Sequence, residues 1–99
     1  MPDERTPEPP EARPPHLLTL VVRRSGDDER DRKRLRRLHG YLTQYPGQDR
    51  FRFELVGNGK RAVLDFPHDA IEINDDALDF AAGMLGEDNV FVDPLDAME

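Results

Sequence analysis

The sequence contains no cysteine, which excludes a disulfide framework, a thiolate metal site and a cysteine nucleophile. Long apolar runs are missing as well: the longest covers about six residues, whereas a transmembrane helix needs about 20. Serine occurs once, as Ser25, and no histidine lies in its predicted local structure, so nucleophilic catalysis has no support. We therefore expect a cytoplasmic protein with no membrane span, and 99 residues allow one domain at most.

Lys and Arg are absent after Arg61, whereas eleven acidic residues follow between Asp65 and Glu99. The segment from His16 to Arg61 has the opposite balance, with twelve Lys or Arg against six Asp or Glu. The net charge of −7 therefore hides a division of the chain into a basic and an acidic part. This division predicts a molecule with one basic and one acidic side, whose field steers and orients partners. The alternative is that both kinds of charge only solvate the surface.

Proline and acidic residues dominate residues 1–15, which hold six prolines and four acids. This composition does not bury a core and favours an extended tether. It also lacks the basic and apolar stretches of a signal peptide. We therefore interpret residues 1–15 as a disordered Pro-rich linker within a longer protein, residues 16–94 as a single α/β domain, and residues 95–99 as a flexible acidic tail.

The apolar run Leu17–Val22 predicts the first strand, and a highly charged helix follows it. The helix is expected to run from about Asp28 to Tyr45, with Asp27 or Asp28 as its N-cap. Apolar residues recur along it at spacings of 3, 4 and 3, which is typical of one helix face. These residues are Leu35, Leu38, Leu42 and Tyr45.

Two glycines and one proline lie in or directly after this helix. Pro46 and Gly47 are expected to end it, since proline cannot continue the hydrogen-bond ladder and glycine accepts a positive φ. Gly40 weakens the helix interior by about 1 kcal/mol relative to alanine. We interpret Gly40 as a residue that lets the helix lie close to the sheet.

A β-hairpin is the clearest local prediction. Alternating residues predict strands over 51–56 and 61–66, joined by a turn at 57–59. The series expected to face the helices is Phe51, Phe53, Leu55, Ala62, Leu64 and Phe66. The outward series is Arg52, Glu54, Arg61, Val63 and Asp65. Because the aromatic rings point inward, the sheet is not expected to offer a platform on which nucleic-acid bases stack.

The remaining elements extend the alternation of strands and helices. Residues 70–73 are expected to form a short extra strand. A second helix begins after Asn74 or Asp75 as its cap and ends at Gly86. Residues 89–92 form the last predicted strand.

The element order β-α-β-β-(β)-α-β decides the expected fold class. Right-handed crossovers place both helices on one face of a sheet of four to five strands. The prediction is an α/β (α+β) two-layer sandwich of the split βαβ or ferredoxin-like type.

Residues that often carry chemistry have structural explanations here. The three histidines, His16, His39 and His68, lack metal-ligand spacing, and His39 is expected to pack on the helix flank or at the surface. The acidic runs at 27–29 and 75–76 fit helix capping rather than a calcium loop. We therefore assign no catalytic, cofactor-binding or metal-binding residue, and we do not expect this chain to be an enzyme.

The charged helix carries a cluster of cations, which are Arg30, Arg32, Lys33, Arg34, Arg36 and Arg37. This cluster can contact nucleic-acid phosphates weakly, or it is a solvated helix face paired in part with neighbouring acids. Charge and expected exposure alone select a candidate interaction surface of six residues. They are Arg30, Lys33, Arg34, Arg37, Arg52 and Arg61.

Several segments together resemble a known family over residues 16–93. They are Leu17–Val22, Leu35-Arg36-Arg37-Leu38, Tyr45-Pro46-Gly47, Phe51–Phe66, Leu78–Gly86 and Asn89–Val92. The chain is similar in these segments to the C-terminal domain of the bacterial replicative DNA polymerase III alpha subunit. In that family a helix ending at a YPG-like turn precedes a strand, and an L-L-G-like helix end precedes the final strand.

The resemblance implies a non-catalytic module that docks the polymerase onto other replisome proteins, chiefly the tau subunit of the clamp loader. The parent chain would be a DNA-directed DNA polymerase, whose magnesium-binding carboxylates belong to other domains. The family therefore supplies no catalytic residue, cofactor or metal for this chain.

Two other classes of function stay open on the residues alone. A small regulatory domain with this strand order would bind a ligand near a glycine-containing loop after the first strand, where Ser25-Gly26 lies. A single-stranded nucleic-acid-binding module would use the basic helix, and its affinity would rise as salt falls.

Overall fold

The computed structural model describes residues 15–95, and its elements follow the predicted order. They are β2 (His16–Arg23), α1 (Asp28–Leu42), β3 (Pro46–Gly57), β4 (Lys60–Asp65), α2 (Asp75–Leu85), the short 3-10 helix η2 (Glu87–Asn89) and β5 (Val90–Pro94). The predicted linker 1–15 and tail 95–99 lie outside the described residues, except for Pro15 and Leu95.

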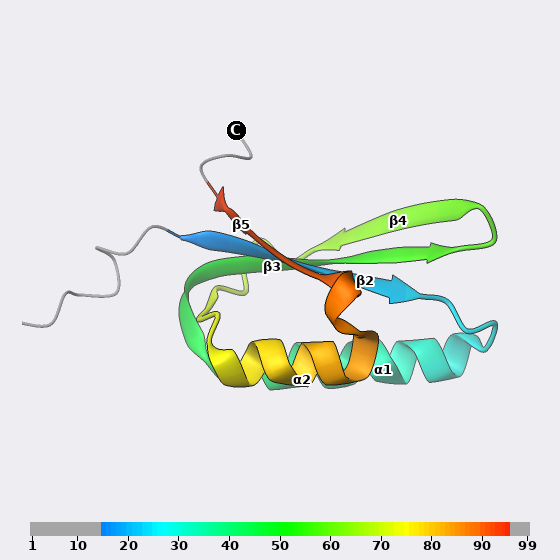
Figure 1. Ribbon diagram of the computed structural model, residues 1–99, viewed down its shortest axis with the longest axis horizontal. Coiled ribbons are helices and arrows are strands. Elements are labelled where there is room, and N and C mark those ends of the chain that lie inside the picture. The colour runs from blue at the N-terminus through cyan, green and yellow to red at the C-terminus, as the bar shows by residue number, and fades with distance from the viewer. Residues whose placement is uncertain (1–14, 96–99) are drawn as a thin grey trace, which may run out of the picture.

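The described chain forms two layers, a sheet and a pair of helices that cover one of its faces (Figure 1). The strand order is β4-β3-β2-β5, with β2 parallel to β3 and the other neighbours antiparallel. The predicted α+β two-layer class is therefore confirmed. Within this class β2 and β3 are direct neighbours, whereas in a split βαβ unit another strand lies between them. β4 and β5 form the two edges of the sheet.

The core lies between the helix-facing side of the sheet and the apolar faces of the helices. Phe51 and Phe53 are each 1% exposed, and Phe51 stacks on Phe66 with ring centroids 4.8 Å apart. The predicted inward orientation of these rings is therefore confirmed. Leu64 faces the same way but is 38% exposed, because neither helix covers the edge strand β4. The other buried core residues are Leu18, Leu20, Val22, Leu38, Leu42, Ile71, Ala77 and Ala81.

The capping residues predicted the start of α1 correctly, but the spacing of apolar residues predicted its end too far along the chain. Asp27 caps α1, with its carboxylate accepting the N–H groups of Glu29 and Arg30. The predicted extension to Tyr45 is wrong, since α1 ends at Leu42. Thr43 N–H still bonds to the carbonyl of His39, and the N–H groups of Gln44 and Tyr45 then bond to the third preceding carbonyl, as in a 3-10 turn. A residue before proline is disfavoured in the α conformation, so the helix cannot reach Tyr45.

Gly47 and Gly40 have roles opposite to those predicted. Gly47 does not have a positive φ, and Pro46 and Gly47 open β3 instead of capping α1. A Cβ atom on Gly47 would lie 2.8 Å from the carbonyl oxygen of Ile71 and from Cα of Glu72. At Gly40 nothing lies within 4 Å of an added Cβ. The close approach of two backbones therefore occurs at Gly47.

The segment 70–73 is not a strand. Only Ile71 makes isolated bridges, to Pro46 and to Asp49. The hydrogen bonds of the following residues go to partners outside a ladder: Glu72 N–H to the carbonyl of Tyr45, and Ile73 N–H to the Asp49 carboxylate. The described sheet accordingly has four strands.

The hairpin turn and the last strand are shifted by one residue from their predicted positions. Asn58 and Gly59, with φ of 56° and 72°, form a two-residue turn, and Gly57 already pairs with Lys60. Positive φ at both central residues is the type I′ geometry that suits the twist of a hairpin. Asn89 belongs to η2, so β5 begins at Val90.

Candidate functional site

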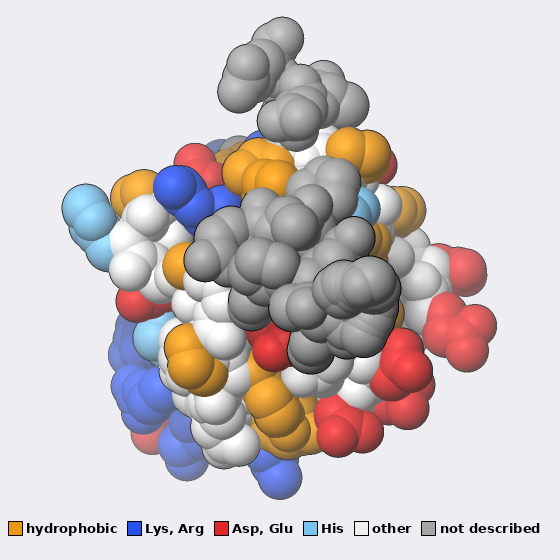
Figure 2. Space-filling model, turned by 90° about the vertical axis from the view of Figure 1, so that its left-hand side faces the viewer, with side chains coloured by type: hydrophobic (Ala, Val, Ile, Leu, Met, Phe, Trp, Pro, Cys, Tyr) orange, Lys and Arg blue, Asp and Glu red, His pale blue; other side chains and the backbone are white. Residues whose placement is uncertain are grey.

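The two helices differ in net charge: α1 is basic beyond its acidic first turn, which holds Asp28, Glu29 and Asp31, and α2 is acidic. α1 carries six Lys or Arg, of which all but Arg34 are exposed, whereas α2 carries Asp75, Asp76 and Asp79 and no cation. Figure 2 shows Lys and Arg on one side of the helical layer and Asp and Glu on the other. On the face that Figure 2 shows, the basic and acidic side chains of the helical layer are therefore largely separated, as the division of the chain predicts.

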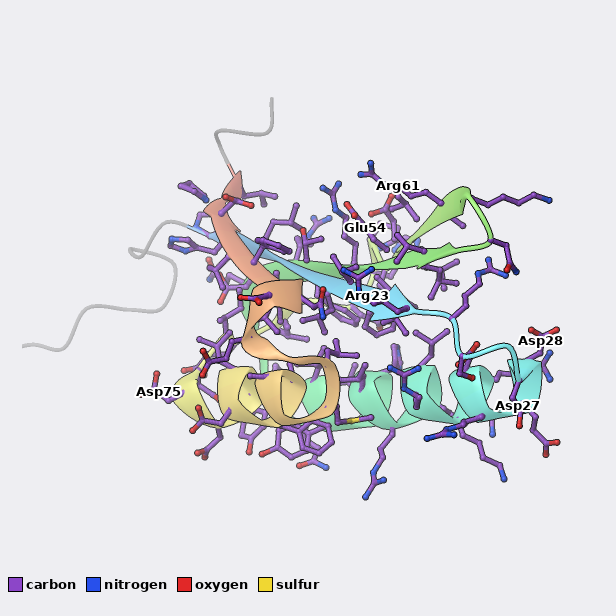
Figure 3. All side chains as sticks on the ribbon, turned by 45° about the vertical axis from the view of Figure 1, so that its right-hand side comes forward. Arg23, Asp27, Asp28, Glu54, Arg61 and Asp75 are labelled. Carbon is purple, nitrogen blue, oxygen red and sulfur yellow. The ribbon has the colours of Figure 1, made fainter. Side chains whose placement is uncertain are left out.

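The six residues of the predicted interaction surface do not lie together. Arg30, Lys33, Arg34 and Arg37 line a shallow depression on α1 beside Met84 of α2. Arg52 and Arg61 belong to β3 and β4, and Figure 3 shows Arg61 with Glu54 on the side of the sheet that faces away from the helices. Strand alternation sends these two arginines to the open face of the sheet, as the outward series of the hairpin predicts, so they lie in the opposite layer from the four cations of α1. A role of the six residues in binding stays a prediction.

Glu54 holds both arginines of the open sheet face. Its Oε2 lies 3.0 Å from Nη2 of Arg61 and 3.8 Å from Nη2 of Arg52. The Glu54 side chain is only 14% exposed, so the carboxylate is partly withdrawn from water. These two arginines are thus engaged within the fold, which leaves less of their charge for a partner.

Arg34 is also engaged within the fold. Its Nη1 donates to the carbonyl oxygen of Arg23 at 3.1 Å and lies 3.3 Å from Oδ1 of Asp31. Ser25 donates to the same carboxylate through its hydroxyl, at 2.8 Å, and through its backbone N–H. Ser25 is thus a structural hydrogen-bond donor that joins the β2–α1 loop to the helix.

This cluster lowers the pKa of Asp31. The largest cause is the hydrogen bond from the Ser25 hydroxyl, and the Ser25 N–H and the Arg34 charge act in the same direction. Burial opposes them, since it disfavours the charged carboxylate. The carboxylate is held by the loop and by Arg34, which is a structural role rather than that of a proton donor.

His39 packs at the helix flank, as predicted. Its ring centroid lies 5.1 Å from that of Phe66 and 5.8 Å from that of Phe51. Nε2 lies 3.1 Å from Oδ2 of Asp69, and both side chains are about two-fifths exposed. The sequence spacing of 30 residues gave no sign of this pair.

An apolar groove of about 320 Å³ lies between α1 and β4. Leu35, Phe53, Leu64 and Phe66 form its floor. Arg32, Arg36 and His39 of α1 form its rim. We call it the α1–β4 groove. The alternation of the hairpin placed Leu64 on the helix-facing side but did not reveal that two helices leave the edge strand uncovered.

The described residues offer no site for metal chemistry. Within residues 15–95 no three His, Asp or Glu side chains come together in a way that could hold an ion. In the same range neither helix has the length and apolar character needed to cross a bilayer.

Comparison with known proteins adds no relative: no family model, curated protein or solved structure matches this chain. The family resemblance of residues 16–93 therefore stays a prediction. What the chain itself offers for function is its charged helices and the α1–β4 groove.

Proposed function

We propose that this chain is a non-catalytic, cytoplasmic protein-interaction domain of a bacterial replicative DNA polymerase III alpha subunit. It docks the polymerase onto the tau subunit of the clamp loader, or onto another replisome protein. The observation that carries the proposal is the unequal charge of the two helices: α1 carries five exposed cations, with its acids confined to the first turn, whereas α2 carries acids and no cation. Segregated charge orients a macromolecular partner and speeds its encounter more than it stabilises a fold.

The segments behind the family resemblance have specific positions in the fold, which supports the proposal. The Tyr45-Pro46-Gly47 turn lies where α1 passes into β3, and Gly47 allows that backbone to approach Ile71. Gly86 ends α2 with a φ of 95°, which favours glycine. These are positions at which the residue type is needed for the backbone path.

A retention assay tests the proposal. The 99-residue chain is immobilised, shown to be folded by circular dichroism, and presented with the cognate tau subunit. Retention that weakens as salt rises is expected, because exposed charges are screened. Loss of retention in the double variant Arg30→Glu with Lys33→Glu, but not in Asp76→Lys, would assign the contact to the basic helix. A folded chain that retains no tau contradicts the proposal.

Single-stranded DNA is a second candidate partner, favoured by the five exposed cations of α1. Of the Lys and Arg side chains of this helix, only Lys33 and Arg34 make ion pairs with other described residues, namely Glu29 and Asp31. A fluorescence titration with a labelled oligonucleotide at low and moderate salt tests it. Binding that falls steeply with salt is the expected signature of phosphate contacts, and no binding at low salt removes this candidate.

A further inference from the structure

We propose that the α1–β4 groove binds an acidic peptide segment of a partner protein, which inserts one or two large apolar side chains between α1 and β4. This inference deepens the proposed function and rests on it only for the partner being a protein. The groove is a different surface from the six cations that the sequence predicted, because it combines an apolar floor with a basic rim.

The floor of the groove is apolar surface that the fold leaves open. Leu64 is 38% exposed although it faces the helix-covered side of the sheet. Leu35 and Phe66 lie partly buried beside it. The groove is wide open to solvent and does not enclose a ligand, which suits one or two side chains of a partner better than a cofactor.

Two of the three rim side chains carry charge that no ion pair within residues 15–95 compensates, whereas the third, His39, lies beside Asp69. Arg32 and Arg36 are exposed, and neither makes an ion pair or hydrogen bond with another residue of 15–95. In this they differ from Arg34, Arg52 and Arg61, which are held by carboxylates. An apolar floor beside unpaired cations is complementary to an apolar side chain flanked by carboxylates.

The same geometry disfavours the other occupants. A second copy facing this groove with its own would bring like charges of Arg32 and Arg36 together. Nucleic-acid bases need aromatic rings presented to solvent, but Phe53 is 1% exposed and Phe66 is stacked on Phe51. The side chain most open in the floor is the aliphatic Leu64.

Fluorescence anisotropy with synthetic peptides tests the inference on the 99-residue chain. The probe is a short labelled peptide with a central Leu-Phe pair flanked by aspartate and glutamate. One comparison peptide has lysine in place of each acid, and another has serine in place of Leu-Phe. The probe is expected to bind, less tightly as salt rises, and each comparison peptide about tenfold or more weakly.

Matched variants locate the site. Leu64→Asp and Arg36→Glu are each expected to weaken probe binding about tenfold or more. Val92→Asp is the control for Leu64→Asp, since Val92 is a 42% exposed aliphatic residue of the other edge strand, β5. Arg50→Glu is the control for Arg36→Glu, since Arg50 lies on β3 outside the groove. Both controls are expected to bind as the unchanged chain does. Amide shift changes on binding should centre on Leu64 and its neighbours.

Several results would overturn the inference. Equal binding of the lysine peptide, equal loss in the matched controls, or no probe binding by the folded chain shows that the groove does not select acidic apolar segments. If a single-stranded oligonucleotide displaces the probe, the groove binds nucleic acid instead. If the chain does not bind the probe but forms a dimer that Leu64→Asp disrupts, the groove binds a second copy. Tau retention unaffected by Leu64→Asp contradicts the groove and leaves docking intact. Probe binding without tau retention supports the groove and contradicts docking to tau.

Discussion

Asp49 Oδ2 accepts the backbone N–H of Ile73 at 2.9 Å. The other oxygen of the same carboxylate accepts the N–H of His16 at 2.8 Å, and the Asp49 side chain is fully buried. One residue of β3 thus ties down the start of β2 and the segment that leads to α2. These partners lie 33 and 24 residues away in the sequence.

Asp49→Ala is expected to lower the free energy of unfolding by about 2–5 kcal/mol, because two backbone N–H groups lose a charged acceptor in the interior. Urea denaturation of both chains at neutral pH measures the difference. Glu72→Ala, an exposed neighbour of Ile73, is the control and should change little. A loss below about 0.5 kcal/mol for Asp49→Ala contradicts the structural role of this carboxylate.

Gly40→Ala is expected to stabilise the protein by about 1 kcal/mol, because alanine is the better helix former and its Cβ meets nothing. For a domain of this size the melting temperature should rise by about 4–8 °C. Gly47→Ala is the opposite case, since its Cβ would overlap the backbone of Ile71 and Glu72, and it should lower the melting temperature. Equal effects of the two substitutions contradict the positions assigned to these glycines.

Asp31→Asn tests how the free energy of unfolding depends on pH. The pKa of Asp31 is lowered in the folded protein, chiefly by Ser25, so its contribution to stability is fully present above the unfolded value near 4. The contribution is lost as pH falls through the folded pKa. The stability difference between the two chains should therefore be constant near neutral pH and shrink in acid. A difference that grows below pH 4 contradicts the lowered pKa.

Arg34→Ala and Arg30→Ala separate a structural cation from an exposed one on the same helix. Arg34 donates to the carbonyl of Arg23 and pairs with Asp31, so its removal should cost about 1 kcal/mol of unfolding free energy. Arg30 is exposed and should change stability by less than about 0.5 kcal/mol. Thermal melts of both variants check this, and equal losses contradict the assignment.

Local signals in the sequence predicted much of the fold. Asp27 and Asn74 are caps because a side-chain oxygen at those positions accepts a free N–H of the first turn. The inward rings of the hairpin follow from the period of two that every strand imposes. Each of these features depends on residues a few positions apart, which sequence patterns record.

What sequence reasoning missed depends on contacts between distant residues. The buried Asp49, the close approach at Gly47 and the two isolated bridges of Ile71 all join β3 to the segment before α2. The α1–β4 groove exists because two helices do not cover four strands, which composition does not reveal.

Calorimetric titration of the 99-residue chain with the cognate tau subunit measures docking itself. We expect a saturable complex that weakens with salt, is weakened about tenfold or more by Leu64→Asp, and is unchanged by Val92→Asp. No heat of binding from a chain shown to be folded, at protein concentrations where a micromolar complex would form, contradicts it.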